Sequence, residues 1–223
     1  DPGPRTLFFM LVLLSALAAP LQRMLPLFVS EVFRAGETSY GLLLGLFGAG
    51  AVLGGLTLGR WPTWYPRHHL IPLSLTLTGA CMTLFCTTRS LPLASVWIFV
   101  AGLAWIWAFS NMITALQLRV SDVMRGRALS VANMAMFGAM PLGSLLAAVL
   151  GSRLAAWSGA TEPAAAAVQL GVGTGALLLT ALGLLLLIWR TPEIDAEGPA
   201  NPPPTRSLWH GVTAKAHRPL TPS

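Results

Sequence analysis

Charged residues are scarce in this sequence. They account for 10% of its 223 residues, whereas 54% are hydrophobic. An ordinary soluble domain carries about a quarter charged residues, so the deficit excludes a water-exposed surface over most of the chain and indicates lipid surroundings. The formal net charge of +6 does not indicate nucleic-acid binding, because the basic residues fall between apolar runs rather than along one stripe.

Cysteine is almost absent as well, and its spacing excludes two further kinds of site. Cys81 and Cys86 lie five positions apart inside an apolar run, which places them on different faces of a helix. Neither a disulfide nor a metal site follows from this pattern, so we interpret both thiols as structural. His68 and His69 follow an aromatic-rich stretch and indicate interfacial anchoring rather than a metal site.

Sequence patterns for catalysis and nucleotide binding are missing. The glycine-rich stretch Gly171–Gly175 lies inside an apolar run with no strand before it, unlike a nucleotide-binding loop. The residues also show no constellation of nucleophile, base and acid. The sequence therefore predicts a protein that is not an enzyme and that holds no metal or cofactor.

What the sequence does contain is a series of long apolar runs. A membrane span requires about 20 mostly apolar residues, and a helix suits lipid because it satisfies its own backbone polar groups. The sequence therefore predicts an all-α integral membrane protein with six transmembrane helices. Their expected ranges are 6–33, 39–58, 70–88, 92–118, 129–154 and 164–189.

The two ends of the chain differ from these runs. The chain opens with Asp1 and lacks the basic segment, short apolar segment and cleavage site of a signal peptide. We therefore expect residues 1–5 to be a short cytoplasmic lead and the chain to be a piece of a longer protein. After Trp189 the sequence becomes proline-rich and polar, so residues 190–223 are predicted to form a disordered cytoplasmic tail.

Arginines near the ends of the predicted helices are unevenly distributed. One set of connections contains Arg5, Arg60, Arg67, Arg119, Arg125, Arg127 and Arg190. The opposite set contains Arg34, Arg89 and Arg153. Because basic residues are enriched in cytoplasmic loops, we expect both termini of this chain to be cytoplasmic.

The stretch RVSDVMRGRALS, residues 119–130, is the densest cluster of charge in the chain. We expect it to form a cytoplasmic loop between the fourth and fifth helices. Two interpretations stay open: the arginines hold the loop at the inner leaflet, or ion pairs of Asp122 and Arg125 form a latch that differs between inward-open and outward-open states. The candidate residues of the cytoplasmic loops are Arg60, Arg67, Asp122, Arg125 and Arg127.

Glycines recur at spacings of four in the second predicted helix. Each costs roughly 1 kcal/mol relative to alanine in a helix interior, so their number requires a reason. Small residues at this spacing let helices approach closely in lipid, and hinge movement is an alternative that can coexist with packing. The candidate packing glycines are Gly41, Gly45, Gly50, Gly54, Gly55, Gly59, Gly138 and Gly143.

A short internal similarity relates the second helix to the fifth. FGAGAVLGG at residues 47–55 resembles FGAMPLGSL at residues 137–145. These two helices are expected to run in opposite directions through the membrane. The similarity therefore indicates an inverted three-plus-three repeat.

Residues 117–159 carry the pattern Q-L-x-V-x-D-x-x-R-G-R-A-L followed by G-x-M-x-L-G-S. This resembles the loop between helices ten and eleven, and helix eleven itself, of major facilitator superfamily transporters. The match looks most like the bacterial transmembrane secretion effector branch, which includes siderophore exporters similar to the enterobactin exporter and macrolide efflux pumps. YGLLLGLFGAGAVLGGLTLGR at 40–60 is similar to helix eight of that branch, and RMLPLFV at 23–29 to the outer part of helix seven.

The resemblance covers about residues 6–189 and implies the carboxy-terminal half, helices seven to twelve, of a twelve-helix transporter. It implies proton-driven export of small organic solutes by alternating access across the bacterial inner membrane, with the proton gradient as energy source. The expected partners are the lipid bilayer, a small-molecule substrate and the missing amino-terminal half or a second half-transporter. The alternative is a truncated or standalone six-helix protein that binds or scaffolds without transport.

Polar residues within the predicted spans are candidates for a substrate cavity, since polar groups in lipid require a reason. Arg23 is the basic residue deepest inside a span, and Gln22 adjoins it. Arg23 either faces a cavity and pairs with an anionic group, or extends toward the outer interface near Glu31. Because the sequence has no Asp or Glu at mid-membrane, the main titrating carboxylate is expected in the missing half.

The fourth and fifth predicted helices supply the remaining candidates. Steps of three and four place Trp107, Ser110, Asn111, Thr114 and Gln117 on one helical face. The resemblance makes this helix ten, which lines the cavity in that superfamily; hydrogen bonding between helices is the alternative. A second stripe suits either an adaptable apolar pocket or ordinary core filling, and it comprises Asn133, Met136 and Met140.

Overall fold

The computed structural model describes residues 2–58, 67–120 and 122–188. Within these ranges the chain forms helices and short connections. They are α1 (Pro2–Leu27), the π-helix η1 (Phe28–Val32), α2 (Glu37–Leu58), α3 (Arg67–Thr87), α4 (Leu91–Arg119), α5 (Asp122–Ser158) and α6 (Pro163–Ile188). Six helical segments are long and apolar enough to cross a membrane, which confirms the predicted all-α membrane architecture.

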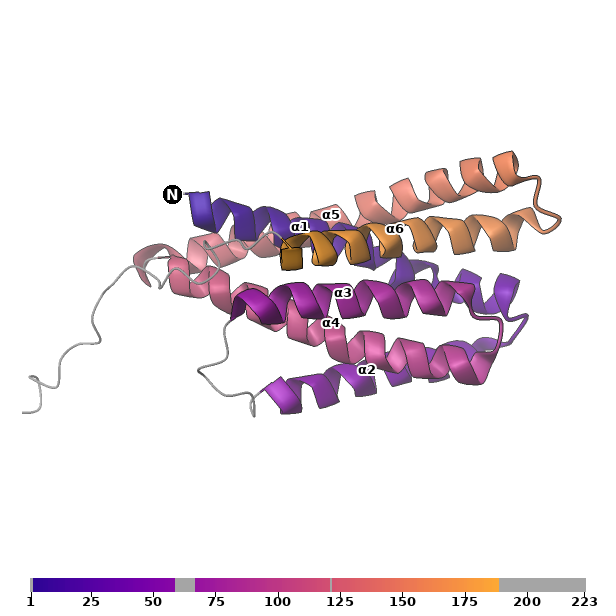
Figure 1. Ribbon diagram of the computed structural model, residues 1–223, viewed down its shortest axis with the longest axis horizontal. Coiled ribbons are helices and arrows are strands. Elements are labelled where there is room, and N and C mark those ends of the chain that lie inside the picture. The colour runs from indigo at the N-terminus through magenta and orange to yellow at the C-terminus, as the bar shows by residue number, and fades with distance from the viewer. Residues whose placement is uncertain (1, 59–66, 121, 189–223) are drawn as a thin grey trace, which may run out of the picture.

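The helices run alternately up and down the bundle (Figure 1). The connections from α1 to α2, from α3 to α4 and from α5 to α6 lie at one end, which we call the hairpin end. The start of α1, the end of α6 and the connection from α4 to α5 lie at the opposite end, which we call the terminal end. Each helix of the first triplet (α1, α2, α3) therefore runs antiparallel to its counterpart in the second triplet (α4, α5, α6).

Helix α5 begins earlier than the sequence suggested. The predicted span starts at Leu129, but α5 starts at Asp122 and α4 continues to Arg119. Most of the charged stretch at 119–130 is therefore helical rather than a loop, which corrects the sequence expectation. Methionine, arginine, alanine and leucine are all good helix formers, and their intrinsic preference outweighs the break in hydrophobicity that indicated a loop.

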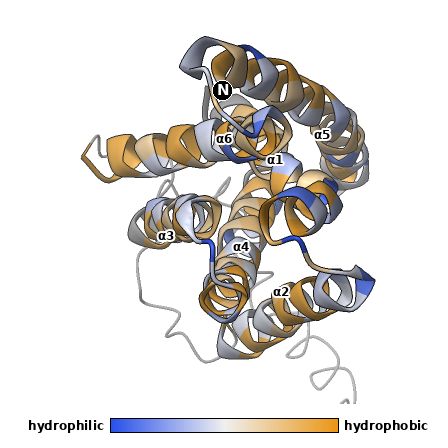
Figure 2. Ribbon diagram, turned by 90° about the vertical axis from the view of Figure 1, so that its right-hand side faces the viewer, coloured by the Kyte–Doolittle hydropathy of each residue, from blue (hydrophilic) through white to orange (hydrophobic). Residues whose placement is uncertain are grey.

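Seen from the hairpin end, the helices form three rows (Figure 2). Helices α1 and α4 lie in the middle, α3 and α6 lie on one side of them, and α2 and α5 lie on the other. Within this arrangement α2 packs against α4, and α5 packs against α1. The second helix of each triplet thus packs on the first helix of the other triplet, a symmetric arrangement that fits an inverted three-plus-three repeat.

Glycines provide the close contacts between these helices. A Cβ atom added at Gly50 would collide with the carbonyl of Phe99 on α4, and one added at Gly143 would collide with the carbonyl of Ala16 on α1. Gly54 likewise leaves no room for a Cβ atom beside Leu103 of α4. These three predicted packing glycines therefore lie where helix backbones approach one another.

The other predicted packing glycines do not lie at such contacts. No neighbouring atom lies within 4 Å of a Cβ atom built at Gly41, Gly45, Gly55 or Gly138. This corrects the sequence expectation at these four positions, because no helix of the described chain reaches that side of α2 or α5. Gly59 lies outside the described residues.

Helices α3 and α6 meet through a reciprocal contact that the sequence analysis missed. A Cβ atom at Gly79 of α3 would collide with Thr180 of α6, and one at Gly183 of α6 would collide with Thr76 of α3. Each helix thus presents a threonine followed three residues later by a glycine, and each glycine accommodates the threonine of the other helix. This contact relates the third helix of one triplet to the third helix of the other.

Candidate functional site

One side of the bundle is incompletely covered by the described helices. On the side away from α3 and α6, helices α1 and α4 lie between α2 and α5 (Figure 2); we call this side the open face. In the most apolar stretch of each helix, only 17% of α2 and 28% of α5 is buried within the bundle, against 61% of α3. Large parts of α2 and α5 are therefore available to lipid or to a partner.

Gln22 and Arg23 are both exposed on α1, between Pro20 and Pro26. Gln22 also lines a small cavity of about 10 Å³ between α1, α2, α3 and α4, close to the space that one water molecule requires. Among the described side chains Arg23 forms no salt bridge, and in particular none with Glu31. The bundle itself therefore leaves this guanidinium charge without an ionic partner.

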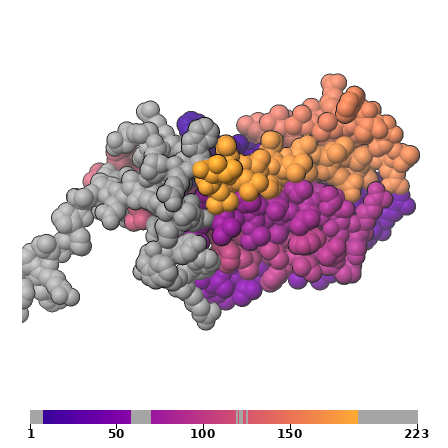
Figure 3. Space-filling model, in the orientation of Figure 1, coloured from indigo at the N-terminus to yellow at the C-terminus, as the bar shows by residue number. Residues whose placement is uncertain are grey.

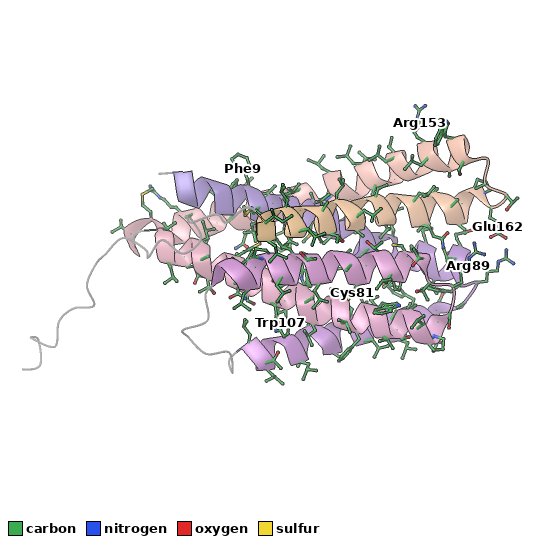
Figure 4. The ribbon with its side chains drawn as sticks, viewed as in Figure 1. Phe9, Cys81, Arg89, Trp107, Arg153 and Glu162 are labelled. Atoms are coloured by element: carbon green, nitrogen blue, oxygen red, sulfur yellow. The ribbon has the colours of Figure 1, made fainter. Side chains whose placement is uncertain are left out.

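Trp107 of α4 connects two helices. Its Nε1–H donates to the backbone oxygen of Gly54 at 2.9 Å and to Oγ1 of Thr57 at 3.1 Å, both on α2 (Figure 4). This is the interhelical hydrogen bonding that the sequence analysis gave as the alternative to a cavity role. Gly54 serves twice here, because its missing side chain admits α4 and its carbonyl accepts the indole hydrogen bond.

The rest of the α4 stripe is partly satisfied within its own helix. Asn111 is 8% exposed, and its Nδ2 donates to the backbone oxygen of Trp107 at 2.8 Å. Thr114 Oγ1 donates to the backbone oxygen of Ser110 at 2.7 Å. Ser110, Thr114 and Gln117 are half-buried, so their side chains are accessible without projecting fully from the bundle.

The α5 stripe is divided by burial. Asn133 is exposed and Met140 is half-buried, whereas Met136 is 2% exposed and belongs to the hydrophobic core. Met136 therefore takes the core-filling role that the sequence analysis gave as its alternative. Asn133 leaves an amide on the surface of α5, and Met140 leaves part of a thioether there.

Most candidate residues of the cytoplasmic loops have no described side chain. Arg60 lies outside the described residues, and the side chains of Arg67, Asp122 and Arg125 are not described. Arg127 is exposed on the first turns of α5. The latch between Asp122 and Arg125 stays a prediction.

The hairpin end contains an ion pair that sequence reasoning missed. Arg34, between α1 and α2, bonds to Glu162, immediately before α6. Arg34 also has a left-handed backbone, with φ of 50°. Figure 4 shows Glu162 at this end together with Arg89 and Arg153. No local sequence signal relates Arg34 to Glu162, because they are 128 residues apart and meet only when the two triplets pack together.

The polar side chains of α1, α4 and α5 suit a binding wall. In the part of the chain that the structure describes, no three His, Cys, Asp or Glu side chains gather to hold a metal ion. The helices that border the open face carry an exposed guanidinium on α1 and accessible amides and hydroxyls on α4 and α5. Such a wall can contact an amphipathic organic molecule when a second wall encloses it.

The sequence of this chain is similar to those of known proteins. Residues 5–210 match the protein family described as transmembrane secretion effector. Over 141 residues the chain is 28% identical to macrolide efflux protein A of Streptococcus pyogenes, which covers 60% of this chain and 34% of that protein. The same protein from Streptococcus pyogenes serotype M6 matches equally. The chain thus spans about a third of these relatives, and no solved structure matches it.

Proposed function

Because the chain belongs to the transmembrane secretion effector family of major facilitator transporters, which are not enzymes, we propose that it is the carboxy-terminal half of an efflux transporter. In this proposal the chain forms one wall of a central path, and an amino-terminal half of six further helices forms the other. Small organic solutes leave the cell as the two halves alternate between inward-open and outward-open states, driven by the proton gradient.

The observation that carries the proposal is Arg23, which is exposed on α1 and forms no salt bridge among the described residues. A charged side chain inside a span costs about 2.5 to 3.5 kcal/mol on insertion scales, and within the described chain no carboxylate offsets that cost for Arg23. Residues of this kind usually mark substrate or ion pathways. A partner half or an anionic group of the substrate would supply the missing interaction.

Further support comes from the relatives and from polar residues of α4 and α5. The matched relatives are named as macrolide efflux proteins, which favours export of amphipathic organic compounds. Half-buried hydroxyls and amides on α4, with the exposed Asn133 on α5, provide hydrogen-bonding groups for such compounds. In this proposal the membrane is a bacterial inner membrane, as the bacterial relatives favour, and both termini are cytoplasmic, as the distribution of the arginines favours.

The test is an efflux assay on a transporter that contains both halves. Arg23→Ala is expected to lower efflux of a macrolide about tenfold or more at unchanged membrane abundance, because the substrate path loses its cation. Arg23→Lys is expected to retain part of the activity, since it keeps the charge without the planar fork. Arg153→Ala, an exposed arginine at the hairpin end of α5, serves as the matched control. Unchanged efflux by Arg23→Ala at equal abundance would contradict the proposal.

The second candidate is a standalone six-helix protein that binds or scaffolds, favoured by the extensive uncovered surface of α2 and α5. The coding sequence upstream of Asp1 separates the two candidates. Six further spans in frame support the transporter, whereas a stop codon there supports the standalone protein. If the chain stands alone, it could transport only as a pair of halves. Crosslinking in membranes would then capture a dimer, and a monomer alone would exclude such a pair.

A further inference from the structure

A groove lies between α3 and α6 and opens toward the hairpin end. Its volume is about 380 Å³, and it is lined by residues of both helices and by Arg89 just beyond α3. Figure 3 shows α3 and α6 side by side on the face of the molecule turned toward the viewer, away from the open face. The groove therefore opens on the outside of the bundle, where a membrane-spanning protein meets lipid.

The groove exists because α3 and α6 touch closely at one level and separate at another. At Gly79 and Gly183 the helices leave no room for an added Cβ atom. Nearer the hairpin end, a Cβ atom added at Gly173 would meet only the Cβ of Cys86, at 3.9 Å. Gly173 and Cys86 thus form a floor with free space above it.

The mouth of the groove carries N–H donors and a positive charge. Arg89 is exposed, forms no salt bridge among the described residues, and has no acidic side chain beside it in the groove. Gln169 lies across from it on α6 and is half-buried. The hydroxyl of Thr87 already donates to the backbone oxygen of Leu84 at 3.0 Å, so the guanidinium and the amide are the groups left to donate. Guanidinium groups bind phosphate through paired N–H bonds.

The length of the groove is mostly apolar, because the hydroxyls of Thr83 and Thr174 that line it donate to backbone oxygens of their own helices. It extends along α6 from Gln169 past Gly173 to Leu177, which is about 12 Å at the rise of an α-helix. Arg89 follows the end of α3 at Thr87, so the cation lies where a span leaves the hydrocarbon and the apolar part lies at acyl-chain depth. Charge and depth therefore match a molecule with an anionic head and a hydrocarbon tail.

We propose that this groove binds one anionic phospholipid from the leaflet at the hairpin end. The lipid phosphate accepts hydrogen bonds from Arg89 and Gln169, and one acyl chain lies over Gly173 toward Leu177. The site belongs to the back of the bundle and is separate from the open face. A phospholipid is favoured over a free phosphate because the groove continues into apolar surface well beyond its charged mouth.

The test titrates the full 223-residue chain, purified in detergent, with palmitoyl-oleoyl phosphatidylglycerol and counts bound lipids by native mass spectrometry. The wild-type chain is expected to retain one lipid, and Arg89→Gln is expected to weaken binding at least tenfold. Arg153→Gln removes an equivalent charge at the same end outside the groove and is expected to bind as wild type. Gly173→Leu fills the groove above its floor and is expected to abolish binding without changing the charge.

Several outcomes would overturn the proposal. Equal binding of phosphatidylglycerol by Arg89→Gln and Arg153→Gln would show a general attraction to anionic lipid. Equal binding of phosphatidylcholine and phosphatidylglycerol by the wild-type chain would show that the groove does not select an anionic headgroup. Displacement of the lipid by inorganic phosphate alone would reduce the site to an anion site. A covalent dimer formed by crosslinking Leu177→Cys, with no lipid retained, would assign the groove to a second copy of the chain.

Discussion

Most serine and threonine hydroxyls in the described helices are satisfied within their own helix, and two other polar side chains differ from this pattern in informative ways. Serine and threonine hydroxyls of the described helices donate to backbone oxygens one turn earlier, as Ser74 and Thr78 do. Trp107 differs because its indole reaches another helix. Arg23 differs because no ionic partner for it is found in the described chain. The first difference bears on stability and the second on the proposed function.

Replacement of Trp107 by phenylalanine tests the first difference. The change keeps the aromatic packing and removes the donor to Gly54 and Thr57 of α2. Hydrogen bonds between membrane helices contribute about 0.6 kcal/mol on average and up to about 1.7, so thermal unfolding in detergent is expected at a slightly lower temperature. Thr57→Val is the control and should have a smaller effect, since the oxygen of Gly54 remains as an acceptor. Unfolding of Trp107→Phe at the wild-type temperature would refute a stabilising bond.

Substitutions of Arg34 separate the stability contributed by its ion pair from the free-energy cost of its left-handed backbone. The pair with Glu162 is exposed on both sides, and such pairs contribute about 0.2 to 1 kcal/mol. A left-handed backbone costs a residue with a side chain about 1 to 2 kcal/mol, and glycine avoids that cost. Arg34→Ala is therefore expected to destabilise the chain, whereas Arg34→Gly leaves it unchanged or more stable. Equal destabilisation by both substitutions in thermal unfolding would contradict this separation.

At the level of helices, glycines decide where two elements touch. Spacing in the sequence predicts that glycines are used for packing, yet it does not show which of them face another helix. Gly50 and Gly54 do, while Gly41 and Gly45 on the same helix do not. The contact at Gly79 and Gly183 escaped prediction because neither glycine belongs to a conspicuous repeat and the partner residue lies on a distant helix.

The helix-level prediction compares two glycines of α6. Gly183→Ala forces a Cβ atom against Thr76 and is expected to destabilise the chain by about 1 to 3 kcal/mol, the usual cost of overpacking. Gly173→Ala meets only Cys86 at van der Waals distance and is expected to stabilise by up to about 1 kcal/mol, because alanine favours the helix. The measurement is thermal unfolding of both variants in the same detergent. The same sign for both would contradict the close contact.

The sequence predicted the number and type of helices because lipid imposes a simple requirement on apolar length. It failed at the start of α5, where charge was interpreted as a loop although Met124, Arg127 and Leu129 all favour helix. It also grouped Met136 with Asn133 by spacing alone, and burial separates them. The other helices determine which side of a membrane helix faces protein. Hydrophobicity does not predict that side, because lipid and the protein interior are equally apolar.

At the scale of the whole molecule, the two ends of the bundle are expected to lie on opposite sides of a membrane. Val123, at the terminal end of α5, is 93% exposed, and Trp157, at the hairpin end of the same helix, is 88% exposed. With Cys81 and Cys86 changed to alanine, Trp157→Cys is expected to react with an impermeant maleimide in spheroplasts. Val123→Cys should react only after permeabilisation, because the terminal end is proposed to be cytoplasmic. The reverse pattern would invert the proposed orientation.

The reciprocal contact of α3 and α6 couples substitutions in one triplet to substitutions in the other. A mutation that enlarges Gly79 or Gly183 collides with a threonine in the other triplet, so its survival depends on a second mutation there. Over many generations, accepted substitutions are therefore expected to occur in pairs, one in each triplet. The four positions concerned are Thr76, Gly79, Thr180 and Gly183. At Gly41 and Gly138 an added Cβ atom would meet no atom of the described chain, so no such dependence arises there within the described chain.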